Sequence, residues 1–289
     1  MVIGVVCFGF AWWWYYPDSL LRVVVCDVGQ GDAILIQQGF NQVIIDGGPN
    51  ESLLSCLGKF VPFWDKRIEM VVMTHPQADH YTALEGLLER YDVKLWLANG
   101  VISDAATFER IREKVIAENA RVELPSAGKK IRIGKMEWKV VWPRVKQGKE
   151  EIWKKQNLEG VEGISPEELG LEDVNQVSVG LSLKYGQFSG LFTGDLGSAE
   201  EQALINSGVL GEYVFLKMPH HGSKYSSSTG FIRKTSPRVV VVSVGRNNGY
   251  GHPNSDIMSR YDAVGAKIYR TDKEGVVVVV SDGGKWWVK

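Results

Sequence analysis

Short, β-branched or apolar runs recur along the chain, and several of them end in a turn that carries Asp or His. Runs of this length and composition, separated by Gly-containing turns, predict strands. They occur at Leu21–Val25, Ala33–Gln37, Gln42–Asp46, Met70–Thr74, Lys135–Trp142, Val177–Tyr185, Leu191–Thr193, Val214–Met218, Arg238–Val244, Lys267–Tyr269 and Gly275–Ser281.

Helical spacing of apolar residues appears between these strands. It follows Glu51 and recurs at Thr82–Arg90, Asp104–Asn119, Ser198–Asn206, Thr229–Lys234 and Asn254–Val264. Strand-rich halves with interspersed helices predict an α/β architecture in which two sheets pack together and the helices lie outside. A chain of 289 residues is long enough to bury such a core.

The two ends of the pattern define the domain boundaries. Residues 1–16 carry no charge, yet they are fewer than the roughly 20 residues that span a bilayer. The Trp and Tyr residues from Trp12 to Tyr16 suit a membrane interface. A signal peptide would have a basic residue before the apolar run, and this chain has none there. We interpret residues 1–18 as the remnant of a membrane anchor, with an interior strand as the alternative. The folded domain would then occupy 19–289, membrane-associated and outside the cytoplasm.

Between Arg144 and Asp173 the pattern gives way to charged, Gly-rich sequence. A connection of this length predicts a surface insertion, and we expect one short helix in it, at Pro166–Leu169.

The three cysteines, Cys7, Cys26 and Cys56, form no pair with metal-ligand spacing. Cys26 lies in an apolar, strand-like run, which predicts a buried free thiol rather than a disulfide.

Charge is informative only locally, because the formal net charge is −1. No acidic residue occurs from Tyr213 through Ser255, whereas six basic residues do: Lys217, Lys224, Arg233, Lys234, Arg238 and Arg246. This segment is either a solvated face or a positive field beside a site for an anionic substrate.

All five histidines lie at strand ends or in turns, next to Asp, Gly or Pro. They are His75, His80, His220, His221 and His252. Loop residues on a rigid scaffold are where catalytic groups concentrate. We therefore expect one shared site rather than five separate solvated side chains.

The sharpest motif is Thr74-His75-Pro76-Gln77-Ala78-Asp79-His80. A turn that leaves a strand edge can aim His75, Asp79 and His80 at one point, as imidazole and carboxylate ligands for a metal. A second motif, Thr193-Gly194-Asp195, presents a carboxylate at a strand end.

The third motif is His220-His221-Gly222-Ser223. Adjacent histidines on extended backbone would point to opposite sides and play different roles. The turn Asp27–Asp32 adds two acids, which either support the site or, as in a plain hairpin, only satisfy backbone amides.

In this order the motifs resemble the metallo-β-lactamase fold and, more narrowly, the hydrolase domain of the ComEC competence-protein family. The family pattern has D-V-G-Q-G-D, H-P-x-x-D-H, N-x-x-S, T-G-D, H-H-G-S and G-H-P. The matching residues are Asp27–Asp32, His75–His80, Asn175 with Ser178, Thr193–Asp195, His220–Ser223 and Gly251–Pro253. The resemblance runs from about Leu21 to the C-terminus and implies a four-layer αββα sandwich.

The resemblance also implies roles. His75 and Gln77 would serve one metal, Asp195 would bridge, and the other metal would be held by Asp79, His80 and His220. Asp79 would also hold the attacking water, His221 would contact the scissile phosphate or protonate the leaving oxygen, and His252 would assist. The supporting residues would be Asp27, Asp32 and Asn175. Ser223 and Lys224 would bind substrate phosphate.

One departure concerns Gln77, where the superfamily usually has His, and the chain has no His between His80 and His220. Gln77 offers only an amide oxygen, and Asn175 another. Oxygen ligands favour Mn²⁺ or Mg²⁺ over Zn²⁺. We expect one or two divalent ions, Mn²⁺ or Zn²⁺, with one well-formed position and one weak position.

The implied reaction is metal-assisted hydrolysis of a phosphodiester, with single-stranded DNA as the first substrate and a DNA-uptake channel protein as a partner. Two alternatives stay open. One is hydrolysis of a small phosphodiester of the phosphocholine type, or of a lactone or lactam, on the same scaffold. The other is a catalytically degraded DNA-binding module of an uptake machine.

Overall fold

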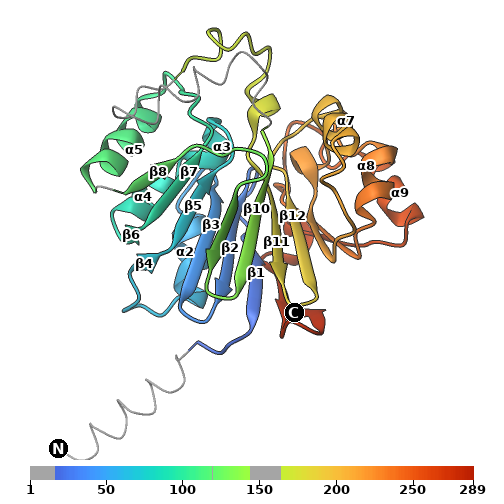
Figure 1. Ribbon diagram of the computed structural model, residues 1–289, viewed down its shortest axis with the longest axis horizontal. Helices are drawn as coiled ribbons and strands as arrows, with labels where there is room; N and C mark the ends of the chain where they lie inside the picture. The colour runs from blue at the N-terminus through green and yellow to red at the C-terminus, as the bar shows by residue number, and fades with distance from the viewer. Residues whose placement is uncertain (1–16, 119, 144–163) are drawn as a thin grey trace, which may run out of the picture.

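Two mixed β-sheets lie face to face in the computed structural model, which describes residues 17–118, 120–143 and 164–289 (Figure 1). The first sheet has the strand order β17-β16-β1-β2-β3-β5-β7-β8. Its strands are β1 (Leu21–Val25), β2 (Ala33–Gln38), β3 (Asn41–Gly47), β5 (Met70–Met73), β7 (Leu95–Ala98), β8 (Arg121–Glu123), β16 (Val277–Ser281) and β17 (Trp286–Val288).

The second sheet has the order β15-β14-β13-β12-β11-β10-β9. Its strands are β9 (Lys130–Ile133), β10 (Met136–Trp142), β11 (Gly180–Tyr185), β12 (Phe188–Phe192), β13 (Phe215–Lys217), β14 (Val239–Val242) and β15 (Lys267–Arg270). A separate parallel pair joins β4 (Arg67–Ile68) to β6 (Asp92–Val93). In each large sheet one half is antiparallel and the other parallel: β3, β5, β7 and β8 run parallel in the first, and β12 to β15 in the second.

The sheets pack through the period-two alternation of their strands. On β1, Leu21, Val23 and Val25 belong to the apolar layer between the sheets, where they join Trp138 of β10. Val24, on the opposite face of β1, packs with the helices outside the first sheet. Both faces of the strand are therefore buried, which explains its continuous apolar run.

Helices cover the outer face of each sheet (Figure 1). The first sheet is covered by α2 (Ser52–Phe60), α4 (Leu84–Leu88) and α5 (Ala106–Ala117), and the second by α7 (Ser198–Asn206), α8 (Thr229–Thr235) and α9 (Ser255–Ala263). Short turns of helix complete the chain: α3 (Ala78–Tyr81), η1 (Val174–Val177), η2 (Pro219–Gly222) and α10 (Thr271–Glu274). The predicted four-layer αββα sandwich is confirmed.

The expectation of a free thiol at Cys26 is wrong. Cys26 forms a disulfide with Cys56 of α2, with the two Cα atoms 6.0 Å apart. Both residues are buried, and α2 packs directly on the sheet where β1 ends. The pairing arises from this packing, which the separation of 30 residues in the sequence does not reveal. Cys7 lies outside the described residues.

Three other expectations concern local structure. The segment Pro166–Leu169 is a turn rather than a helix: Gly170, with φ of 62°, ends it, and its N–H donates to the carbonyl of Glu167. The proposed anchor residues 1–16 and most of the charged insertion, 144–163, lie outside the described residues. Among the helices that are described, none combines the length and apolar character needed to cross a membrane.

Candidate metal centre

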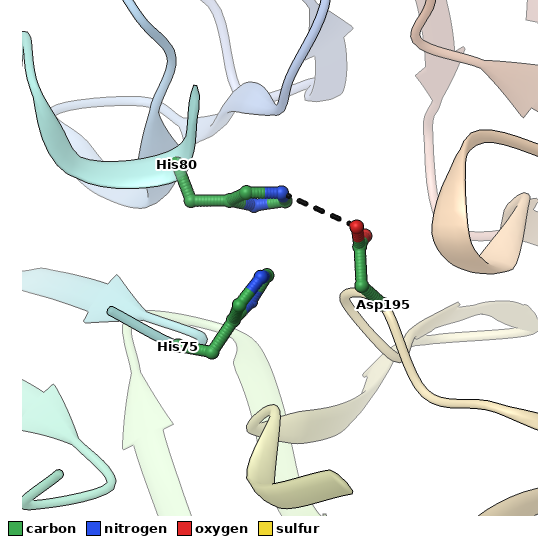
Figure 2. A group of neighbouring side chains, drawn as sticks. All are labelled: His75, His80 and Asp195. Atoms are coloured by element: carbon green, nitrogen blue, oxygen red, sulfur yellow. Dashed lines mark ion pairs between the residues drawn. The ribbon is translucent and has the colours of Figure 1, made fainter. Parts of the chain in front are cut away.

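Most of the polar residues that meet between the two sheets follow strands of the parallel halves, whereas Asp32 lies in the turn before β2 and Asp46 lies within β3. His75 lies two residues after β5, Asp195 three residues after β12, and His220 and His221 follow β13. The carboxyl ends of parallel strands share one edge of a sheet, which is where sites form in α/β proteins. Figure 2 shows His75 and His80 projecting toward Asp195, which comes from the second sheet.

Within the part of the chain that the structure describes, four overlapping groups of side chains place their ligand atoms within 4.8 Å of one another. Their members are His75, His80 and Asp195; Asp79, His80 and His221; Asp32, Asp46 and His80; and Asp32, Asp195 and His221. His80 belongs to three of these groups, so the centre is built around it.

Asp46 fixes the orientation of the His80 ring. The Nδ1 atom of His80 lies 2.9 Å from Oδ2 of Asp46, and Asp46 also accepts from the N–H and hydroxyl of Thr74. Nδ1 therefore carries a proton toward Asp46, while Nε2 is buried without a hydrogen-bond partner. An imidazole held in this way by a carboxylate is the usual arrangement of a metal ligand.

His221 is held in the same manner from the other half of the molecule. Its Nδ1 donates to the carbonyl of Ser243, 2.8 Å away, and lies 3.5 Å from Oδ1 of Asp32. Its Nε2 is buried and lacks a hydrogen-bond partner. The Nε2 atoms of His80 and His221 both approach Oδ2 of Asp195, at 3.5 and 3.3 Å.

The electrostatics of this cluster attract positive charge. Burial alone would raise the pKa of Asp195, but His221 and His80 outweigh burial and hold that pKa well below its usual value. Burial would lower the pKa of His80, yet the carboxylates of Asp195 and Asp46 raise it well above the usual value. A buried carboxylate between two imidazoles thus favours either protons or a cation, and a metal would displace the protons.

His75 differs because both of its ring nitrogens have protein partners. Nε2 lies 3.1 Å from Oε1 of Gln77, and Nδ1 lies 3.0 Å from the hydroxyl of Thr74 and 3.3 Å from that of Ser178. Burial, reinforced by His80, lowers the pKa of His75 to about 3. His75 is therefore neutral, with its Nε2 proton directed at the amide oxygen of Gln77.

A buried ion pair lies next to His221 and helps to hold the centre in place. Nζ of Lys217 lies 2.7 Å from Oδ2 of Asp32, and both side chains are at most 2% exposed. Lys217 therefore does not contribute to a surface field, contrary to one interpretation of the basic segment. Asp32 is also placed by Gly31: a Cβ at Gly31 would lie 2.0 Å from the carbonyl oxygen of Asp79, so only glycine lets the two turns meet.

The centre opens into a cleft of about 360 Å³. Its walls are polar and aromatic, formed by Gln30, Gln77, Ala78, Asp79, Asn175, Asp195, His220, His221, Tyr250 and His252. The side chain of Asp79 is 32% exposed, so it alone among the clustered ligands reaches well into solvent. Oδ1 of Asn175 is buried there without a hydrogen-bond partner.

The two adjacent histidines depart from the expected extended backbone. His220 and His221 both have left-handed dihedral angles, with φ of 48° and 52°, so both rings turn toward Asp195 rather than to opposite sides. Such backbone is costly for non-glycine residues and persists at functional sites. Gly222 follows, where a Cβ would lie 2.6 Å from Pro253. His221, and not the expected His220, belongs to the ligand groups found among the described residues.

The solvent exposure of three side chains revises the roles expected for them. Asp27 is exposed and accepts the N–H of Gly29, as in the plain hairpin, whereas Asp32 supports the site. Ser223 is 2% exposed and its hydroxyl accepts the N–H of Tyr225, so it does not face a substrate phosphate. Lys224 is exposed outside the cleft lining, with its ammonium 5.0 Å from the Tyr225 ring centre.

Sequence reasoning missed Asp46, Ser243 and Lys217. Asp46 ends a predicted strand and is followed by two glycines. This is a strand-end carboxylate like Asp195 and could have been found. Ser243 acts through its backbone carbonyl, which no residue pattern reveals.

The metallo-β-lactamase superfamily profile matches residues 26–246. ComE operon protein 3 of Bacillus subtilis is 27% identical, over 91% of this chain and 33% of that protein. Competence protein ComA of Neisseria gonorrhoeae is 26% identical, over 90% of this chain and 32% of that protein. The chain thus spans about a third of the length of these relatives.

Among solved structures, the metallo-β-lactamase fold protein YhfI of Bacillus subtilis superposes with a TM-score of 0.55 at 10% identity, over 93% of this chain and all of that one. This likeness shows the fold. The predicted resemblance is confirmed, and the chain belongs to the metallo-β-lactamase superfamily, in which it is similar to ComEC-type competence proteins.

Proposed function

We propose that the protein is a metal-dependent phosphodiesterase that cleaves single-stranded DNA. The observation that carries this proposal is a set of buried atoms that converge at the floor of the cleft without a hydrogen-bond partner: Nε2 of His80, Nε2 of His221 and Oδ1 of Asp195. Buried polar atoms without partners are rare in native proteins and call for an explanation. Two imidazole nitrogens and a carboxylate that converge in this way are typical ligands of a divalent cation.

In the proposed ligand set, Asp79, His80 and His221 hold one ion and Asp195 reaches it from the second sheet. His75, Gln77 and Asn175, together with Asp195, would hold a second ion more weakly. The first set mixes nitrogen and oxygen donors and suits Zn²⁺ or Mn²⁺, while the second is richer in oxygen and favours Mn²⁺.

A divalent cation in this centre supplies Lewis-acid polarisation of a phosphoryl oxygen and acidifies a water nucleophile. Side chains of the protein would orient the water and bind the phosphate. Asp79 reaches into the cleft and is placed to orient the water and accept its proton. His220 and His252 line the same cleft, where an imidazole N–H can donate to a phosphoryl or leaving oxygen. His221, being buried, is assigned to the cation instead of the leaving group.

Two features support DNA as the substrate. The first is the relative from Neisseria gonorrhoeae that is named a competence protein, because competence is the uptake of DNA. The second is the segment from Tyr213 through Ser255, which carries the cleft residues His220 and His252 and has no acidic residue. Lys224 and Arg246 of this segment are exposed. Exposed basic residues raise the local concentration of a polyanion.

The Cys26–Cys56 disulfide supports a location outside the cytoplasm, because disulfides persist in oxidising compartments. We propose that the domain works there beside a DNA-uptake channel protein and is held at the membrane through residues 1–16.

The test is turnover of a labelled single-stranded DNA by the purified protein with Mn²⁺, next to an Asp79→Asn variant. We expect cleavage that falls at least about 100-fold in the variant. Cleavage of small phosphodiesters alone would replace DNA as the substrate. A protein that binds DNA but neither turns it over nor binds Mn²⁺ or Zn²⁺ would be a binding module instead.

A further inference from the structure

An exposed aromatic side chain lies at the rim of the cleft. Tyr250 is 73% exposed, although it is one of the residues that line the cleft together with Asp195. Most large apolar side chains of the described residues are buried, so an exposed ring at the site itself needs an explanation. Solvent-facing aromatic residues at such positions are typical of surfaces that bind flat ligands.

The ring of Tyr250 is held in place by the residues beneath it. It stacks on the imidazole of His252, with the planes 17° apart and the centroids 5.8 Å apart. His252 meets His220 edge to face at 6.0 Å, and Nε2 of His220 lies 3.8 Å from Asp195. A continuous row of rings therefore leads from the metal centre to the solvent.

The loop that carries Tyr250 is fixed at both ends. The side chain of Asn248 accepts the N–H of His252 and donates to its carbonyl, at 3.0 and 2.8 Å. At the other end, a Cβ at Gly245 would lie 2.9 Å from the backbone nitrogen of Gln30, so the loop packs closely on the Asp27–Asp32 turn. The aromatic ring is thus presented on a braced loop, at low conformational cost to a ligand.

We propose that Tyr250 is the stacking platform for a nucleobase of the substrate, next to the scissile phosphate. The proposal rests on the phosphodiesterase function above and adds how that site recognises a single strand. Aromatic rings that receive bases, together with cationic groups that follow the backbone, are the elements of single-strand binding. A base in a duplex is already stacked on both faces, so only an unpaired or extruded base offers a face to Tyr250.

The test compares two oligomers of equal length, both with phosphorothioate linkages that resist hydrolysis. One is an oligothymidylate and the other carries abasic residues, and each has a terminal fluorescein for anisotropy in the presence of Mn²⁺. For Tyr250→Ala we expect the Kd of the oligothymidylate to rise about tenfold, with less than about a twofold change for the abasic oligomer. Tyr250→Phe keeps the ring and should retain the wild-type Kd.

Phe63→Ala is the matched control, because Phe63 is 77% exposed and does not line the cleft. It should change neither Kd. Equal losses for both oligomers in Tyr250→Ala, or equal wild-type affinity for both, would overturn the stacking site. Absence of wild-type binding to either would overturn it as well. Base-dependent binding that Tyr250→Ala removes, in a protein that cleaves no DNA, would uphold the stacking site and contradict the nuclease function alone.

Discussion

His75 and His221 both lie close to Asp195, but the partners of their ring nitrogens differ. Both nitrogens of His75 are engaged, one with Gln77 and the other with hydroxyl groups. His221 engages only Nδ1 and leaves Nε2 buried and unpartnered beside Asp195. One half of the centre is thus satisfied by the protein itself, whereas the other half leaves buried ring nitrogens that can hold a proton or a cation. The centre is therefore asymmetric, and its two positions should respond differently to mutation.

The largest expected effect is a loss of stability when the ion pair between Lys217 and Asp32 is broken. Lys217→Met would remove the ammonium that pairs with the buried carboxylate of Asp32 and leave Nδ1 of His221 near it, at 3.5 Å. This loss should lower the free energy of unfolding by about 3–5 kcal/mol. Urea unfolding followed by circular dichroism measures it. The double variant Lys217→Met, Asp32→Asn removes both charges and should recover part of the loss. Lys267→Met, at an exposed position, should stay within about 0.5 kcal/mol. Equal effects at Lys217 and Lys267 would contradict the ion pair.

His221 and His75 should differ in how much each contributes to metal affinity. His221→Gln, which keeps much of the side-chain volume, should weaken binding of the tighter ion by more than about 100-fold, since loss of a ligand should exceed the loss of a supporting residue. His75→Gln should weaken it by less than about tenfold. Titration calorimetry with Zn²⁺ and Mn²⁺ measures both. If the two variants lost affinity equally, the two positions would not differ as the geometry indicates.

A smaller effect is expected from Asp46, which holds the ring of His80. Asp46→Asn keeps one acceptor oxygen. It therefore gives up either the bond from the N–H of Thr74 at Oδ1 or the two bonds from the Thr74 hydroxyl and His80 at Oδ2. Metal affinity should fall about 10–100-fold, with the fold retained. The same calorimetry measures it, beside Asp92→Asn at an exposed position as the control. Unchanged affinity would show that the orientation of His80 does not depend on Asp46.

The sequence predicted the fold well because buried strands have a strong local signature. The bounds predicted for β1 and α7 match the structure, and the motif residues His75, His80 and Asp195 do meet at one point. Tertiary contacts were less predictable. The bond between Cys26 and Cys56 depends on where α2 packs, and the roles of His220 and His221 depend on two left-handed backbone conformations. Neither is encoded in residue type or spacing.

The last prediction changes the number of ions rather than their affinity. Gln77 is the residue whose amide oxygen engages Nε2 of His75. Gln77→His would replace that acceptor with an imidazole and leave His75 and the new histidine side by side at the weak position. Elemental analysis after gel filtration should then show about two ions per chain, compared with one in the wild type. Stability should change by less than about 1 kcal/mol, since Gln77 is only partly buried.

A single ion in the variant would mean that Thr74 and Ser178, which contact the other nitrogen of His75, set the asymmetry. Two tightly held ions in the wild type would mean that the hydrogen bond between His75 and Gln77 yields readily to a metal, and the asymmetry would then lie in the identity of the two ions and not in their number.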